Sequence, residues 1–130
     1  MKTLNQPYFN MNIGDKYTVT HVVTEKDTAV SYGSGGLPVY ATPAMICLME
    51  KTAYRFAAEE GLQTVGTKVN ISHLRACKAG TEVTCMAEVI ETEGRRIVFK
   101  VEVSDSCGLL GEGVHERFVI DPERFMAKLG

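Results

Sequence analysis

Apolar and polar residues alternate with a period of two along most of the chain. In residues 81–92, for example, Val83, Cys85, Ala87 and Val89 occupy every second position. This alternation is typical of a β-strand that buries one face. The same pattern predicts five strands, at 16–24, 63–76, 81–92, 96–104 and 109–120. Residues 27–30 either extend the first strand or begin another one.

Short turns lie between the last four predicted strands. Glu93 and Gly94 have the composition of a tight hairpin turn. Strands joined by such turns pair in the antiparallel sense. We therefore expect one antiparallel sheet that presents a single apolar face.

A different pattern marks residues 42–61. Thr42 followed by Pro43 predicts a helix start, because a threonine oxygen accepts from a first-turn N–H and proline needs no partner there. Gly61 predicts the helix end. Residues 44–49 are apolar on every side of this helix, so other elements must surround it. The sequence predicts an α+β fold in which a five-stranded antiparallel sheet wraps a long central helix.

Three segments lie outside these elements. Residues 1–15 are expected to form a loosely held lead-in, and 122–128 a short helical tail. The glycine-rich segment 31–38 is either a connecting loop or a lid over the start of the long helix. A chain of 130 residues can bury one core, so residues 1–130 are predicted to form a single domain.

Composition and charge exclude several classes of protein. The chain is 45% hydrophobic and 23% charged, as in an ordinary globular protein. Its formal net charge of −2 argues against nucleic acid as a partner. The apolar run 44–49 is too short to cross a bilayer, and residues 1–7 lack the apolar segment of a secretory signal. We predict a cytoplasmic protein without a membrane anchor.

The four cysteines are Cys47, Cys77, Cys85 and Cys107. They have neither Cys-x-x-Cys spacing nor a neighbouring histidine pattern, so they do not predict a zinc site. We expect four reduced and mostly buried thiols.

Three polar residues interrupt the apolar pattern: Thr42, Glu50 and His73. A hydroxyl, a carboxylate and an imidazole are the parts of an activated-nucleophile site. Each also has a purely structural interpretation, as a helix N-cap, a surface ion-pair partner and a hydrogen-bonded core histidine.

Helix geometry limits how these groups can meet. Thr42 and Glu50 are eight residues apart, so their Cα atoms lie about 12 Å apart along one helix. A homodimer with its helices side by side could bring Glu50 of one subunit to Thr42 and His73 of the other. This hypothesis predicts a composite site at a subunit interface.

Three motifs carry a resemblance to a known family. They are ATPAMICLME at 41–50, GTKVNISH at 66–73 and HER at 115–117, in order and with similar spacing. Together they resemble the fluoroacetyl-CoA thioesterase-like group of hot-dog enzymes. The resemblance covers roughly residues 17–122 and implies the hot-dog fold.

The resemblance implies hydrolysis of a short-chain acyl-CoA thioester without a metal or redox cofactor. It implies that Thr42 polarises or attacks the thioester carbonyl and that His73 is the general base and acid. Glu50 would act as nucleophile or orient water. Gly66 would let the substrate approach the backbone, and Arg117 would contact the acyl end. Backbone N–H groups at the helix start suit a thioester oxyanion.

Other interpretations of the same scaffold stay open. One is a non-catalytic acyl-CoA-binding or sensing domain, and another is a hydratase-type lyase. Family members specific for fluoroacetyl-CoA are expected to place bulky aromatic residues in the lid, whereas residues 32–37 here read YGSGGL. The candidates for holding the CoA phosphates are Arg75, Lys78, Arg95 and Arg96, which equally suit a solvated surface. A homodimer is expected, with pairing of dimers as an option.

Overall fold

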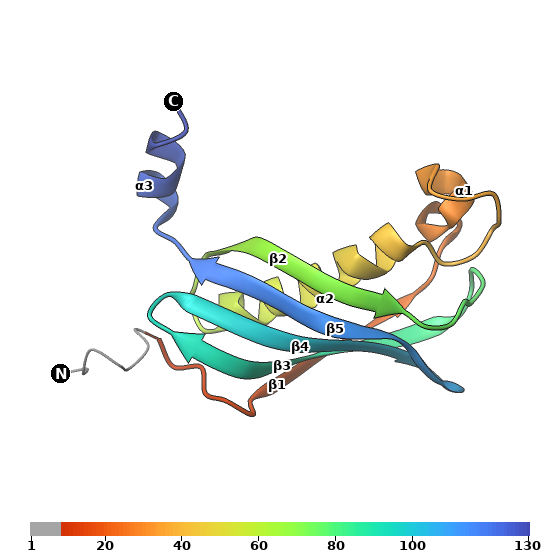
Figure 1. The fold of residues 1–130 in the computed structure, drawn as a ribbon, viewed down its shortest axis with the longest axis horizontal. Coiled ribbons are helices and arrows are strands. Elements are labelled where there is room, and N and C mark those ends of the chain that lie inside the picture. The colour runs from red at the N-terminus through yellow and green to blue at the C-terminus, as the bar shows by residue number, and fades with distance from the viewer. Residues whose placement is uncertain (1–8) are drawn as a thin grey trace.

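The computed structural model describes residues 9–130 (Figure 1). Its strands are β1 (Lys16–Val22), β2 (Thr64–His73), β3 (Glu82–Glu93), β4 (Arg96–Asp105) and β5 (Gly108–Val119). Its helices are a short 3₁₀ helix η1 (Glu25–Asp27), α1 (Ala29–Tyr32), α2 (Thr42–Glu59) and α3 (Pro122–Ala127). These bounds confirm the five predicted strands and the long helix to within a few residues.

The five strands form one antiparallel sheet in the order β1-β3-β4-β5-β2. Tight turns join β3, β4 and β5, while α2 carries the chain across the sheet from β1 to β2 (Figure 1). The strand β2 therefore lies at one edge, with only β5 as a neighbour. The structure confirms the predicted α+β arrangement of a long helix on one face of a curved sheet.

The core lies between α2 and the concave face of the sheet. Met45, Met49 and Ala53 project from the helix, and Val89 and Phe99 from the strands, and all five are fully buried. Burying each large side chain of this kind contributes on the order of 2 kcal/mol. The alternation of buried positions in β3 and β4 confirms the predicted strand faces.

The sheet covers only one side of α2. Cys47 is exposed and Ile46 is partly buried, although both lie within the apolar run 44–49. The expectation that this run is surrounded is therefore wrong for a single chain. Pro43, Ile46 and Cys47 thus form an apolar strip that the sheet covers incompletely, on the same face of α2 as Glu50, whose carboxylate approaches Gly66 of β2.

Residues 27–30 are not a strand. Asp27 ends η1, and its Oδ2 accepts from the backbone N–H of Thr24 at 2.8 Å. The Thr28 hydroxyl then accepts from Ser31 N at 3.4 Å and caps α1. These short polar side chains bond to nearby backbone groups, which favours turns and caps over a strand.

The lead-in is only partly as predicted. Residues 1–8 lie outside the described part of the chain, but residues 9–15 are held firmly rather than loosely. Phe9 and Met11 are buried in the core, and Gly14 N donates to Val89 O at 2.8 Å. The apolar side chains at positions 9 and 11 explain this packing.

Two further findings concern general properties. Within residues 9–130, no helix is long and apolar enough to cross a membrane. All four cysteines are free, but Cys47 and Cys107 are exposed, so the expectation of mostly buried thiols is wrong. Burial of Cys85 raises its thiol pKa to about 11.

Candidate active site

Thr42 and His73 meet at one end of the molecule. A hydrogen bond of 2.8 Å joins Thr42 Oγ1 and His73 Nδ1. Thr42 is the first residue of α2, and His73 is the last residue of β2. The sequence interpretation of Thr42 as an N-cap is wrong, because Ala41 occupies that position with extended backbone angles. The threonine hydroxyl is therefore free to bond the imidazole instead of the helix.

The second nitrogen of His73 points into the protein. Its Nε2 is buried and has no hydrogen-bond partner among the described residues. The ring of Tyr40 lies edge-on to the imidazole, with centroids 6.4 Å apart. If the Thr42 hydroxyl donates to Nδ1, His73 is placed as a general base for that hydroxyl. This arrangement is more than a hydrogen-bonded core histidine requires.

A hollow of about 370 Å³ opens beside this pair. The segment before α2 supplies Ala29, Ser34 and Val39 to its wall, and the residues after β2 supply Leu74 and Arg75. The volume is within the range of small-molecule sites. The segment 31–38 thus borders the hollow, as the lid interpretation requires.

A second cluster surrounds Gly66 in the first half of β2. A Cβ atom at position 66 would lie 3.1 Å from His115 Cε1, 3.2 Å from Arg117 Nη1 and 3.3 Å from Glu50 Oε2. Glycine is needed here because of this close approach and not for a left-handed backbone. Three polar side chains from α2 and β5 thus converge on one point of the β2 backbone.

Arg117 is almost completely buried in this cluster, with 6% of its surface exposed. Its Nε donates to Thr64 Oγ1 at 2.7 Å, and its Nη2 to the carbonyl oxygen of Thr64 at 3.0 Å. The guanidinium carbon lies 5.8 Å from the ring centroid of Tyr54. Burial lowers the pKa of Arg117, while the nearby Glu50 favours its charged form. Arg117 is therefore not a solvated residue at the rim of the sheet.

His115 completes the cluster, although only its place in the HER motif drew attention to it in the sequence. It is 1% exposed, and it lies opposite the buried Phe99 on the neighbouring strand. Register with Phe99 was the available signal, since paired residues of adjacent strands share a face. The register shifts by one residue between Val103 and Ser104, so counting from the hairpin alone would pair Phe99 with Val114 and would miss His115.

The two clusters lie apart within one chain. Gly66 and His73 are seven residues apart on β2, which corresponds to about 23 Å of strand. The structure therefore brings Thr42 and His73 together, and it brings Glu50, Gly66 and Arg117 together. It does not bring the first group to the second.

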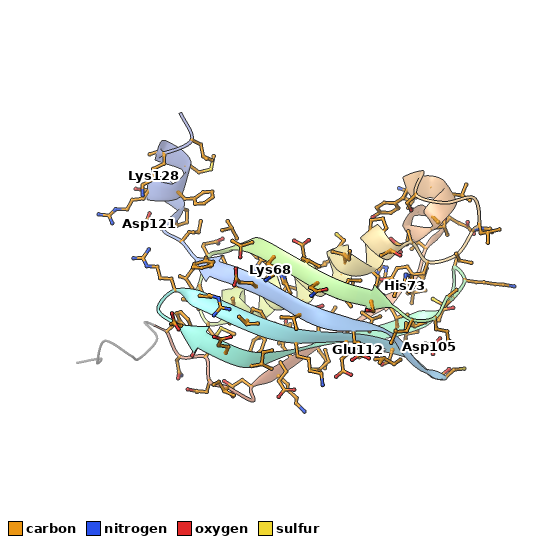
Figure 2. All side chains as sticks on the ribbon, in the orientation of Figure 1. Lys68, His73, Asp105, Glu112, Asp121 and Lys128 are labelled. Atoms are coloured by element: carbon orange, nitrogen blue, oxygen red, sulfur yellow. The ribbon has the colours of Figure 1, made fainter. Side chains whose placement is uncertain are left out.

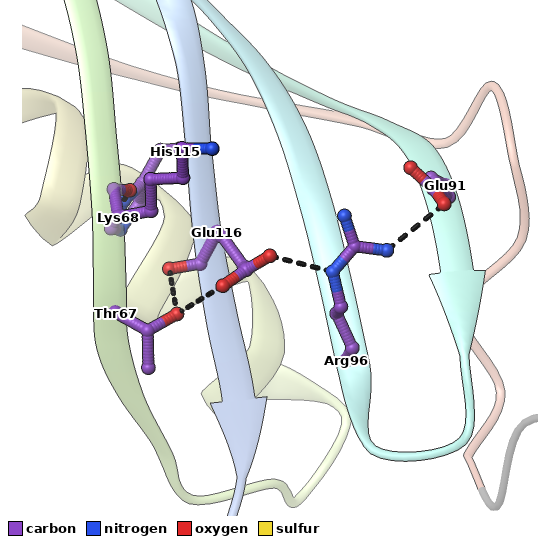
Figure 3. A network of polar contacts seen from close by, with 6 residues as sticks. All are labelled: Thr67, Lys68, Glu91, Arg96, His115 and Glu116. Carbon is purple, nitrogen blue, oxygen red and sulfur yellow. Dashed lines mark hydrogen bonds and ion pairs between the residues drawn. The ribbon is translucent and has the colours of Figure 1, made fainter.

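Two of the four predicted phosphate-binding cations are already paired. Arg75 forms an ion pair with Asp105, and this hydrogen bond lowers the pKa of the Asp105 carboxyl. Arg96 bonds Glu116 at 2.5 Å and Glu91 at 2.9 Å (Figure 3). Among the four candidates, Lys78 and Arg95 are left without an ion-pair partner in the part of the chain that is described.

Comparison with known proteins gives consistent results. The model of the fluoroacetyl-CoA-specific thioesterase family matches residues 23–123. A fluoroacetyl-CoA thioesterase from Streptantibioticus cattleyicolor is 33% identical, with 92% of each chain covered. A solved structure of a fluoroacetyl-CoA thioesterase matches with a TM-score of 0.84 and 34% identity, over 92% of this chain and 96% of the other.

A more distant structure supports the same fold. A Thermus thermophilus protein, described as a thioesterase superfamily member, is 27% identical and matches with a TM-score of 0.83. The match covers 92% of this chain and 90% of that one. The fold is therefore the hot-dog fold, as the sequence motifs implied.

Proposed function

Because the chain belongs to the fluoroacetyl-CoA-specific thioesterase family and is an acyl-CoA thioesterase, we propose that its active site is shared between two subunits of a homodimer. One subunit supplies Thr42 and His73, and the other supplies Glu50, Gly66 and Arg117. The observation that carries the proposal is the separation of these two groups within one chain, each group being well formed on its own.

The edge strand provides the geometry for joining them. Two copies of β2 can pair antiparallel about a two-fold axis at the middle of the strand, between Lys68 and Val69. Such pairing places His73 of one subunit opposite Thr64 of the other. His73 then lies beside the Gly66 cluster of the second subunit. The apolar strip of α2 would be covered by the same contact.

The reaction begins at the thioester carbonyl. Backbone N–H groups at the start of α2 stabilise the developing oxyanion. His73 takes a proton from the attacking hydroxyl and returns one to the departing CoA sulfur, so that the products are the free acid and CoA thiol. Gly66 lets the acyl end approach the β2 backbone, where the Arg117 guanidinium donates to it.

Two versions of the attack fit this arrangement. In one, Thr42 Oγ1 attacks and forms an acyl-enzyme that water then hydrolyses. In the other, Thr42 holds the carbonyl while Glu50 of the second subunit orients the attacking water. A pre-steady-state burst of thiol release distinguishes them, because only an acyl-enzyme that accumulates gives a burst.

Mixing inactive variants tests the shared site. Thr42→Ala and Glu50→Gln are each expected to be inactive, but co-refolding them produces heterodimers with one intact site. Statistical mixing should restore about a quarter of wild-type activity for a symmetric dimer. The matched control is a mixture of Thr42→Ala with His73→Ala. It should restore nothing, because both lesions fall in the same half of each site.

The outcomes are clear-cut. Absence of rescue in the first mixture, or equal rescue in both, would contradict a site divided in this way. The activity itself is tested by thiol release from short, branched and aromatic acyl-CoAs. Tight binding without thiol release would favour the acyl-CoA sensor, and a hydrated product that retains the thioester would favour the lyase.

A further inference from the structure

An acyl-CoA substrate has its phosphates far from its reacting atoms. The pantetheine arm separates the thioester from the pyrophosphate and the 3′-phosphate of the adenosine. The protein has a net charge of −2, so its overall field does not attract this anionic end. A local group of cations must therefore do so, at some distance from Gly66 and Thr42.

Three of the six arginine side chains are already engaged. Arg75 and Arg96 are in ion pairs, and Arg117 is buried in the Gly66 cluster. Three other cations gather at one place: Arg95, Arg124 and Lys128 all line a single hollow of about 140 Å³. None of them forms an ion pair with another residue of the 9–130 range. Like charges that outnumber the carboxylates beside them and form no ion pair favour an anionic ligand.

The position of this hollow suits the length of the substrate. It lies where β5 leaves the sheet, since Val119 N donates to Arg95 O at 2.8 Å and Ile120 N donates to Gln63 O at 2.9 Å. Ile120 is three residues beyond Arg117, or about 10 Å along the strand. Figure 2 shows Lys128, which follows α3, at the end of the molecule opposite His73. The hollow is thus close to the Gly66 cluster of the same subunit, but not part of it.

The wall of the hollow also suits a nucleotide. Phe125 lies among the three cations and offers an aromatic ring for stacking of a base. A second hollow of about 400 Å³ adjoins the first and shares Arg95, Ile120 and Asp121 with it. The one carboxylate in the wall belongs to Asp121, whose Oδ1 accepts from the backbone N–H of Arg124 at 3.1 Å.

We propose that Arg95, Arg124 and Lys128 bind the phosphates at the 3′-phosphoadenosine end of CoA, with Phe125 against the adenine. This inference rests on the proposed function, because it takes the thioester to react beside the Gly66 cluster. It selects Arg95 from the four cations that the sequence suggested, and it adds two cations, one in α3 and one directly after it, that the sequence analysis did not consider.

Truncated substrates give the sharpest test. We expect Arg95→Ala and Arg124→Ala each to raise KM for an acyl-CoA about tenfold, as for loss of a charge-assisted hydrogen bond. The same variants should leave KM for the corresponding acyl-pantetheine, which lacks the nucleotide, unchanged. The matched comparison is Lys78→Ala, which should affect neither substrate. Raising the salt concentration should raise KM for the acyl-CoA alone.

Several results would overturn the proposal. One is an equal rise of KM for both substrates, which would indicate general damage to the fold. Another is a nucleotide-dependent effect of Lys78→Ala in place of Arg124→Ala. A third is unchanged KM in the Arg95→Ala and Arg124→Ala variants, which would leave these residues as solvated surface.

A binding measurement separates this inference from the proposed function. Calorimetric titration with CoA and with adenosine 3′,5′-bisphosphate requires no turnover. If Arg124→Ala lowers the affinity for both ligands while the wild type hydrolyses no thioester, phosphate binding at the hollow is supported and the proposed hydrolysis is contradicted. If the wild type hydrolyses acyl-CoA but binds the bisphosphate no more tightly than the variant, phosphate binding at the hollow is contradicted and the proposed hydrolysis is supported.

Discussion

Nη1 of Arg117 lies 3.1 Å from Nε2 of His115, and this contact defines the state of the imidazole. A guanidinium can only donate, so Nε2 must be the acceptor. Nδ1 of His115 lies 2.9 Å from the carbonyl oxygen of Lys68, which can only accept, so Nδ1 carries the proton. Both bonds require a neutral imidazole. His115 therefore orients Arg117 toward Gly66 without adding a second positive charge.

This pairing predicts how stability depends on pH. Burial lowers the pKa of His115 below its usual value of 6.5. A histidine with a lowered folded-state pKa contributes stability that is complete above pH 6.5 and is lost as the pH falls toward the folded pKa. We expect the melting temperature to fall between pH 7.5 and pH 5, and to fall less in a His115→Gln variant. Differential scanning calorimetry over this range measures both slopes.

The glutamine variant also serves as the control, because its amide keeps one donor and one acceptor. Identical slopes for the two proteins would show that His115 remains protonatable in the folded state, contrary to the hydrogen-bond pattern.

Substituting Gly66 should affect activity more than stability. The atoms nearest to an alanine Cβ would be side-chain atoms of Glu50, His115 and Arg117, at 3.1–3.3 Å, and we expect these to shift by a few tenths of an ångström. We expect Gly66→Ala to reduce kcat/KM about tenfold, equivalent to ~1.4 kcal/mol, through misplacement of these groups. Chemical denaturation should show a loss of stability of less than about 1 kcal/mol.

Gly113 provides the contrasting case in β5. A Cβ there would lie 2.2 Å from the carbonyl oxygen of Asn70 and 2.6 Å from Ile71 Cα, both backbone atoms. Gly113→Ala should therefore destabilise the fold by several kcal/mol, as overpacking does at rigid sites. If Gly66→Ala proved as destabilising as Gly113→Ala, the side chains around Gly66 could not shift as we expect.

The Thr42–His73 pair should be needed for turnover and not for folding. Thr42 is exposed and its side chain makes no helix cap, so Thr42→Ala should leave the melting temperature nearly unchanged. Loss of a positioned hydroxyl or base should reduce kcat by roughly 10²–10⁴-fold. Thr42→Ser keeps the hydroxyl and should retain most of the activity. A fully active Thr42→Ala would remove this residue from the mechanism.

The lid should set the range of acyl groups. A Cβ atom at Gly36 would meet no atom within 4 Å, and Ser34 and Val39 on either side line the hollow beside Thr42. We expect Gly36→Phe to fold normally and to lower kcat/KM for butyryl-CoA at least several-fold more than for acetyl-CoA, by filling free volume. Gly36→Ser is the matched control. Equal effects on both substrates would show that the lid does not contact the acyl group.

The sequence predicted the fold well where one signal dominated. Alternation with fully buried positions such as Val83 and Val101 defined the strands, and Pro43 with Gly61 defined the long helix. It failed at residues 27–30, where local bonds of Asp27 and Thr28 to the backbone outweighed the β-branched composition. Which face of the helix the sheet leaves uncovered could not be read locally, and so Ile46 and Cys47 were expected to be covered.

The sequence named candidate residues for the site and separated Glu50 from Thr42 and His73, as the structure does, but it did not place Gly66 and Arg117 beside Glu50. Thr42, Glu50 and His73 stood out as polar residues against an apolar pattern. The periodicity of one strand or helix, however, does not tell how far its residues lie from those of another element. The environment of Arg117 depends on Thr64 and His115, which only the register of β2 and β5 brings to it. The place of His115 in the cluster likewise depends on the strand register.

The start of α2 shows what such a site demands of the helix that carries it. With Ala41 at the N-cap, the helix forgoes the roughly 1 kcal/mol that serine or aspartate would contribute there. A better-capped helix would be more stable, but in the proposed mechanism its cap would occupy amides that are needed for the oxyanion. We therefore expect a substitution at position 41 that raises the melting temperature to lower the turnover rate.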